Sequence, residues 1–290
     1  MEGEERSDEE LAQQAATADE QAFIALYHRY FARVYDLAIR LSRDRDVAAM
    51  VAQASFFRVY QGLRASPPPG AFKVQLFAIA RRDLTDRMRR HRGPVLEGEE
   101  AFVNADPNLL TNAALAPELP ELARIVWQTA RGLKPDEYEL LDLHVRQLLD
   151  ANEIATVVGS RPEAVQARLV RLRDALEESF TSFVLLSRGR RECLDLDFLV
   201  GDEEWSPMLR RRIIEHLQGC QICQATRRRY PTAAEVLATV TPVAPPPGWD
   251  ETILSRILQA ASAGEQAPAP APQRAARATI RTRRPTAMKA

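Results

Sequence analysis

Apolar residues recur every three or four positions along three stretches near the start of the chain. This period is that of an amphipathic helix, which places such residues on one face. The second stretch must end before residues 66–70, because the three successive prolines there do not continue a helix. Three helices with one apolar face each predict a helical bundle over residues 19–92. The three apolar stripes consist of Phe23, Leu26, Tyr30, Val34, Leu37 and Leu41; of Val47, Val51, Phe56, Val59 and Leu63; and of Phe77, Ala80, Leu84 and Met88.

The helical period disappears over residues 93–117, where acids, prolines and asparagines dominate, and this composition predicts a linker. A second helical region follows over residues 118–180 and contains the pattern of a helix, a tight turn and a helix. Residues 152–158 have the period of a short first helix, and Gly159 supplies the left-handed turn. Ser160 and Glu163 stand at capping-box spacing where the second helix begins.

The second helix of this pattern has an apolar side at Val165, Leu169, Leu172 and Leu176 and a polar side rich in arginine. Arginine and glutamine make bidentate contacts with base edges and neutralise phosphates, so we expect this helix to read a DNA major groove. The alternative is an ordinary surface helix with solvated charges, since short helix hairpins with a glycine turn are common. The candidate DNA-binding residues are Arg161, Glu163, Gln166, Arg168, Arg171 and Arg173.

Three cysteines and one histidine occur together behind this helix, as Cys193 followed by His216, Cys220 and Cys223. Three cysteines do not form an all-disulfide framework, whereas His216 and Cys220 lie one turn apart on a helix and Cys223 reaches the same side. Zn²⁺ prefers thiolate and imidazole ligands, and four protein ligands close its coordination shell. We therefore expect a structural or redox-responsive zinc site. The alternative is that small buried cysteines fill a core beside a surface histidine.

The composition favours an all-α protein, because only 7% of the residues are aromatic and 12 are glycine. A length of 290 residues is enough for two or three domains. The net charge of -1 conceals an acidic N-terminus, residues 1–18, and a basic C-terminus, residues 263–290. Both ends are expected to be disordered tails. Residues 249–262 have the apolar spacing of one further amphipathic helix.

Several classes of protein are excluded by what the sequence lacks. No stretch contains the roughly 20 apolar residues that a membrane span needs, and the acidic N-terminus lacks the pattern of a signal peptide. We therefore expect a cytoplasmic protein without membrane contacts. No acid and base pair, nucleophile motif or phosphate-binding loop is recognisable, so we expect neither enzymatic activity nor catalytic residues.

Residues 19–180 resemble the extracytoplasmic-function sigma family, whose two conserved regions occur here in the same order. The resemblance implies that the chain binds core RNA polymerase, at the β′ clamp helices and the β flap, and promoter double-stranded DNA. Region 2, residues 19–92, would melt the minus-10 element, and region 4, residues 118–180, would read the minus-35 element. The matching motifs are residues 26–30, 53–60 and 78–81 with Asp86 and Arg89 in region 2, and residues 133–135, 153–155 and 159–165 with Arg168, Leu169, Arg171 and Arg173 in region 4.

The resemblance also assigns single residues within region 2. Gln53, Phe56 and Arg58 would contact the polymerase. Arg82, Arg89 and Arg90 would contact the promoter backbone, which attracts cationic side chains. The alternative for the basic end of this third helix is a solvated surface, where cations also interact favourably with the helix dipole.

Region 2 departs from the family pattern at several positions. Family members carry acids where this chain has Ala49, Met50 and Ala54, and a tryptophan where it has Gln75. The loop of residues 65–71, which in the family accepts a flipped promoter base, is rich in proline and has few stacking partners. A degenerate sigma-like interaction or anti-sigma protein that no longer initiates transcription is therefore the alternative function.

Residues 190–232 resemble the zinc-containing anti-sigma domain, whose motif ends in the same His-x-x-x-Cys-x-x-Cys. The first ligand in that family is often histidine, where this chain has Cys193. The helix predicted over residues 249–262 resembles the helix that anti-sigma proteins lay against sigma. A flexible tether raises the effective concentration of such a part. We therefore hypothesise an intramolecular contact in which the zinc module covers region 2 or region 4 and regulates access to polymerase.

Overall fold

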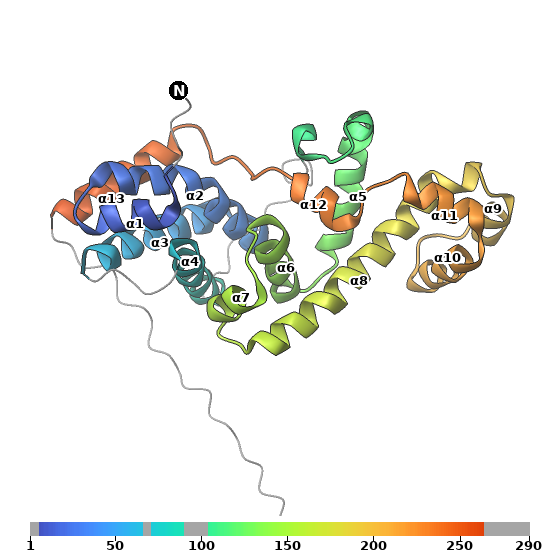
Figure 1. Cartoon of the computed structure of the whole chain (residues 1–290), viewed down its shortest axis with the longest axis horizontal. Coiled ribbons are helices and arrows are strands. Elements are labelled where there is room, and N and C mark those ends of the chain that lie inside the picture. Colours follow the sequence, from blue (N-terminus) through green and yellow to red (C-terminus); the bar gives the residue numbers. More distant parts are fainter. Residues whose placement is uncertain (1–5, 66–70, 90–103, 264–290) are drawn as a thin grey trace, which may run out of the picture.

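The computed structural model describes residues 6–65, 71–89 and 104–263 (Figure 1). Within these ranges the chain forms helices joined by turns, and the β-structure is confined to an isolated antiparallel bridge between Ala105 and Val240. The prediction of an all-α fold is confirmed. Within the same ranges, none of the helices combines the length and the apolar character that crossing a membrane requires.

The first four helices pack together as a bundle, here called the first bundle: α1 (Asp8–Ala16), α2 (Glu20–Ser42), α3 (Arg45–Ala65) and α4 (Phe72–Met88). Asp19 caps α2 by accepting hydrogen bonds from the first backbone N–H groups of the helix. The predicted stripes supply most of the core, whereas Met88, the last residue of the third stripe, is exposed. In the core the Phe23 ring stacks on Tyr60 at 4.2 Å and the Tyr27 ring meets Phe56 at 4.8 Å. Each such aromatic pair stabilises the bundle by about 0.5–1.5 kcal/mol beyond its burial.

Helix α1 corrects the expectation that residues 1–18 are a disordered tail. Ser7 and Glu10 form a capping box at its start, and Leu11 and Ala15 are buried in the first bundle. Asp8 also accepts hydrogen bonds from Arg29 and Tyr30 on α2. Three of the acids that resembled a solvated tail, Asp8, Glu9 and Glu10, lie in the first turn, where negative charge stabilises a helix.

A second bundle follows, made of α5 (Leu119–Arg131), α6 (Pro135–Leu141), the π-helical turn η4 (Asp142–Arg146), α7 (Ala151–Val158) and α8 (Pro162–Ser187). Two 3-10 turns, η2 (Pro107–Leu109) and η3 (Ala113–Glu118), precede it, within the segment predicted as a linker, whose residues 93–103 lie outside the described ranges. Helices α7 and α8 are joined at Gly159, whose φ of 65° is left-handed. This is the predicted helix, turn and helix.

Two details of the second bundle differ from the prediction. The capping box forms between Asp150 and Glu153 at α7, whereas the N-cap of α8 is Arg161, which makes no side-chain cap. Helix α8 also continues past residue 180, because Val184 and Leu185 extend its buried stripe. Residue 180 therefore lies inside a helix and is no structural boundary.

The end of α8 carries a small cysteine module made of η5 (Gly189–Arg191), α9 (Leu194–Val200), α10 (Pro207–Gly219) and α11 (Gln221–Arg228). The module has its own apolar core, separate from that of the two bundles. The Phe183 ring of α8 stacks on Trp205 at 4.0 Å, and Arg210 donates to Ser179 at 2.9 Å. These contacts fix the module to the helix that also bears the predicted DNA-binding face. The core residues are Leu185, Cys193, Leu196, Val200, Leu209, Ile213 and Cys223.

Behind the module the chain returns across both bundles (Figure 1). We call residues 232–248 the strap; it contains α12 (Ala233–Thr239), which packs on α5 and α8. The strap leads to α13 (Trp249–Ser262), which matches the predicted amphipathic helix and packs on α3 and α2 of the first bundle. Residues 264–290, most of the predicted basic tail, lie outside the described ranges.

Candidate functional site

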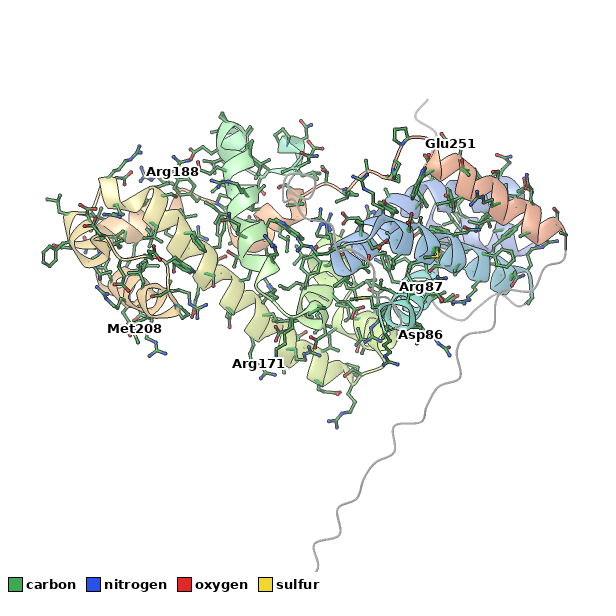
Figure 2. The ribbon with its side chains drawn as sticks, turned by 180° about the vertical axis from the view of Figure 1, so that it is seen from behind. Asp86, Arg87, Arg171, Arg188, Met208 and Glu251 are labelled. Carbon is green, nitrogen blue, oxygen red and sulfur yellow. The ribbon has the colours of Figure 1, made fainter. Side chains whose placement is uncertain are left out.

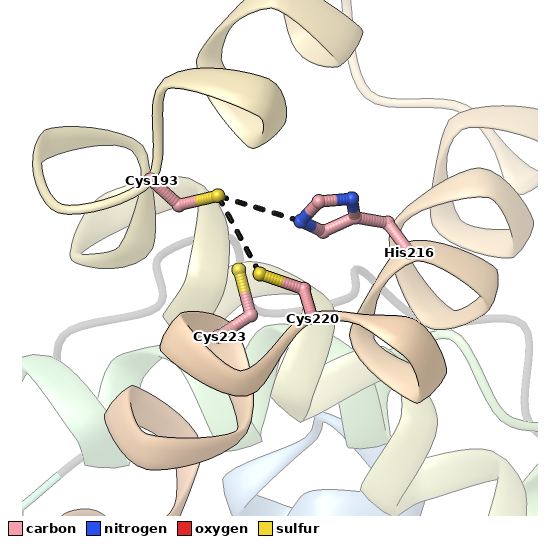
Figure 3. A group of neighbouring side chains, drawn as sticks. All are labelled: Cys193, His216, Cys220 and Cys223. Carbon is pink, nitrogen blue, oxygen red and sulfur yellow. Dashed lines mark hydrogen bonds between the residues drawn. The ribbon is translucent and has the colours of Figure 1, made fainter.

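The four predicted metal ligands come together in the cysteine module (Figure 3). Cys193 is the N-cap of α9, His216 lies in the last turn of α10, and Cys220 and Cys223 begin α11. The Sγ atom of Cys193 lies 3.5 Å from Nε2 of His216 and 3.7 Å from Sγ of Cys220. All four ligand atoms lie within 4.8 Å of one another. The module therefore has a cluster of side chains that could hold a metal ion.

Two of the separations match those of tetrahedral zinc coordination. Zinc–sulfur and zinc–nitrogen bonds of about 2.3 and 2.0 Å at tetrahedral angles place two sulfurs about 3.8 Å apart and a sulfur and a nitrogen about 3.5 Å apart. The distances from Cys193 to Cys220 and to His216 agree with these values. A disulfide would instead require sulfurs about 2.05 Å apart, and all three cysteines are free thiols.

The thiols differ in their tendency to ionise. The backbone N–H of Cys223, with help from the neighbouring thiols, lowers the pKa of Cys220. Burial raises the pKa of Cys223, and the thiols of Cys193 and Cys220 add to this effect. A divalent cation between these ligands would stabilise every thiolate, so binding would release protons.

A clip outside the cluster holds the segment before Cys193 against α11. Glu192 accepts hydrogen bonds from Thr226 at 2.7 Å and from Arg229. Both the arginine and the glutamate are exposed to solvent, so this ion pair adds little to stability. The clip holds Cys193 in a fixed position relative to Cys220 and Cys223.

The predicted DNA-binding residues of α8 lie on its outer side. Arg161, Glu163, Gln166 and Arg173 are exposed, and Figure 2 shows Arg171 directed away from the body of the molecule. Their common face is available to a partner such as a DNA groove. The sixth predicted residue, Arg168, is half-buried and donates to Asp136 at 2.7 Å.

Of the basic residues predicted in the first bundle, Arg82 lies on α4 and Arg89 is its C-cap. Arg82 and Arg89 are exposed, whereas Arg90 lies outside the described ranges. Helix α7 packs on the same helix α4, and Arg81 donates to Glu139 of α6 at 3.1 Å. The two bundles are therefore in contact.

The predicted polymerase-binding residues on α3 have different surroundings. Gln53 is half-buried and lines a pocket with Trp249 and Arg256 of α13. Arg58 is also half-buried and forms an ion pair with Asp83 of α4.

Phe56 is fully buried, so the prediction that it contacts a partner is wrong. Its ring packs against Tyr27 and against Phe23, whose centroid lies 6.5 Å away, in the core of the first bundle. The apolar stripe already places Phe56 on the inner side of its helix. The residue therefore stabilises α3 and offers no surface.

A cluster of buried charges was missed in the sequence. Asp36 and Arg40 on α2, and Asp142 and Arg146 on η4, meet where the two bundles contact. The available signal was local: Asp36 and Arg40 are one turn apart and lie next to the apolar stripe of their helix. Their partners on η4 are too distant in sequence to be found from spacing.

Comparison with known proteins identifies relatives among the RNA polymerase sigma factors, although no family model matches the chain. The RNA polymerase sigma-H factor of Pseudomonas aeruginosa is 28% identical over 182 residues, which cover 60% of this chain and 94% of that protein. The ECF RNA polymerase sigma-E factor of Haemophilus influenzae is also 28% identical over 182 residues, covering 60% of this chain and 95% of the relative.

Two further proteins match a smaller share of this chain. A probable RNA polymerase sigma factor, RfaY, of Xanthomonas campestris is 33% identical over 159 residues, which cover 52% of this chain and 39% of that protein. A solved structure of CnrH in complex with the cytosolic domain of CnrY shares 24% sequence identity, with a TM-score of 0.42, over 58% of this chain and 94% of that chain.

Over about three fifths of its length the chain is thus similar to RNA polymerase sigma factors, among them ECF sigma factors. These relatives support RNA polymerase sigma factor function. Sigma factors are not enzymes, which agrees with the absence of enzyme motifs in the matched part of the chain. The remainder of the chain lies outside the match.

Proposed function

We propose that this chain binds core RNA polymerase and directs it to promoters, with the first bundle acting as region 2 and the second as region 4. The observation that carries the proposal is the exposed basic face of α8, on the second helix of a helix-turn-helix in a homologue of sigma factors. Region 4 would read the minus-35 element through this face. Region 2 would contact the β′ clamp helices through the Gln53 side of α3 and the minus-10 element through α4.

Reconstituted transcription tests this function. The purified chain is added to core polymerase on a pool of promoter fragments, and transcript starts are mapped. The proposal expects starts at a fixed distance from a shared pair of sequence elements. A variant with Arg171 and Arg173 changed to alanine is expected to lose most of these starts. Absence of any factor-dependent start would overturn the proposal.

We further propose that the four ligands of the cysteine module hold a structural Zn²⁺. Two of them, Cys193 and Cys223, are buried, and four protein ligands leave no open position for a water. The separate core of the module is small, so metal binding would supply part of its folding free energy. Burial disfavours the redox-responsive version, because an oxidant reaches chiefly Cys220, which is half-buried.

Metal analysis and peroxide treatment together test the structural site. We expect one zinc per chain, retained after exposure to hydrogen peroxide at concentrations that oxidise free surface thiols. Rapid zinc release with loss of the helical signal of the module would instead support a redox-responsive site. A protein that contains no zinc after expression in zinc-supplemented medium would contradict both versions.

We also propose that the C-terminal part regulates the sigma regions within the same chain. Helix α13 buries Ile253 and Ile257 against the first bundle, and the Tyr27 hydroxyl donates to the carbonyl of Asp250 at 2.8 Å. This places α13 beside Gln53, on the α3 face that would bind polymerase. The cysteine module contacts α8 instead. In this proposal α13 must leave before polymerase gains full access to α3.

A degenerate sigma-like protein is the second candidate. It is favoured by Ala49 and Met50, which stand where the family carries acids and which line the pocket against α13. Pull-down of core polymerase by the full chain and by a chain ending at residue 248 separates the two candidates. Binding by either form supports a sigma factor, and binding by neither form supports the degenerate protein.

A further inference from the structure

Three parts of the chain meet at one buried group of four charges. Asp36 and Arg40 belong to the first bundle, with Arg40 Nε donating to Asp36 Oδ1 at 2.7 Å. Asp142 and Arg146 belong to the second bundle, with Arg146 Nη1 donating to Asp142 Oδ2 at 2.7 Å. Arg146 also donates to Asp36 across the boundary between the bundles. We call these four residues the junction.

The strap completes the junction with its main chain. The Val243 N–H donates to Asp36 Oδ1 at 2.7 Å. Arg146 Nη2 donates to the carbonyl of Val240 at 2.9 Å, and Arg40 Nη2 donates to the carbonyl of Thr241 at 3.2 Å. The same side chains therefore bind the first bundle, the second bundle and the strap. Each of the three parts must break its hydrogen bonds to the other two before it leaves.

The charges of the junction stabilise one another in a buried environment. Burial opposes ionisation of Asp36, but the guanidinium groups of Arg146 and Arg40 hold its pKa below the ordinary value. The carboxylate therefore stays charged at neutral pH. Removing one member of a buried ion pair leaves an uncompensated charge, which is strongly unfavourable. A partly opened junction is for this reason less stable than either a fully closed or a fully opened and hydrated one.

We propose that the junction is an interlock that makes separation of the two bundles and release of the strap with α13 a single transition. This inference rests on the proposed function, in which the two bundles reach separate promoter elements and α13 must leave α3. Linkage requires the coupling to be reciprocal: loosening the strap loosens the contact between the bundles, and the reverse. The interlock would keep a chain with a covered α3 from presenting its two DNA-binding faces apart.

Hydrogen exchange of the full-length, zinc-loaded protein tests the interlock from the strap side. Val243→Pro removes the N–H that donates to Asp36, and the matched control Val243→Ala keeps it. Loss of a hydrogen bond to a charged group is expected to raise amide exchange about tenfold. For Val243→Pro the increase is expected in α13 and also in α4 and α7, which the substitution does not touch. An increase confined to the strap and α13 would overturn the interlock.

A second variant tests the interlock by weakening the contact between the two bundles. Glu139→Gln weakens the ion pair with Arg81 between the two bundles and leaves every contact of the strap intact. We expect faster exchange in α13 as well as in α4 and α7, and unchanged exchange in α13 would overturn the proposal. Circular dichroism shows whether each variant is folded. Exchange data from one folded variant are enough to support or overturn the interlock. Because the experiment contains no polymerase, its outcome is independent of whether the chain binds polymerase.

Discussion

Truncating Ile257 to alanine is expected to loosen α13 from the first bundle. Ile257 is only 1% exposed in the contact with α3 and α2. The change removes three carbon atoms, each of which contributes about 0.8 kcal/mol when buried, so docking weakens by about 2.4 kcal/mol. This corresponds to a roughly fiftyfold shift toward the released helix. If α13 competes with polymerase for α3, the affinity for core polymerase rises by up to this factor.

Two measurements on the same variant separate docking from competition. Trypsin cleavage after Arg256, an exposed residue of α13, reports release of the helix, and fluorescence anisotropy reports binding to core polymerase. We expect Ile257→Ala to be cleaved faster and to bind polymerase more tightly. The control Ser255→Ala, on the exposed side of α13, is expected to match the unmodified chain in both. Faster cleavage with unchanged polymerase affinity would refute the competition.

Two other perturbations have defined outcomes. Cys223→Ser is expected to abolish tight zinc binding and to unfold the cysteine module while α1–α4 stay folded, as read by metal content and by hydrogen exchange; retained zinc would contradict the four-ligand site. If Arg171 and Arg173 contact phosphates, changing both to alanine is expected to weaken DNA binding by a similar factor on most sequences. The slope of the logarithm of the binding constant against the logarithm of the salt concentration is expected to fall by about one for each lost phosphate contact. An unchanged affinity and slope would remove this face from the proposed DNA contact.

Much of the fold follows from local pattern. The stripe at Val47, Val51 and Val59 defines α3, and the left-handed Gly159 divides α7 from α8, because both depend on residues that are near in sequence. The metal cluster was also predictable from the close spacing of His216, Cys220 and Cys223. The expected single helix is not formed, because Cys220 has an extended backbone and joins α10 to α11.

The contacts between bundles were not predictable in this way. The bond between Arg146 and Asp36 joins residues 110 positions apart, and the bond between Val243 and Asp36 spans 207 positions. Neither bond produces a periodic pattern in the sequence. Phe56 shows the limit of transferring a motif, because its place on the buried stripe excluded the surface role that the family resemblance gave it. Tertiary packing decided the contacts between the bundles, whereas the local stripe already decided the place of Phe56.

Transcription by core polymerase reconstituted with this chain tests the central claim most directly. The account predicts factor-dependent starts at fixed spacing from a shared pair of promoter elements, and more of them from a chain that ends at residue 248 and lacks α13. It would be contradicted if neither form of the chain bound core polymerase or directed any start on the promoter pool.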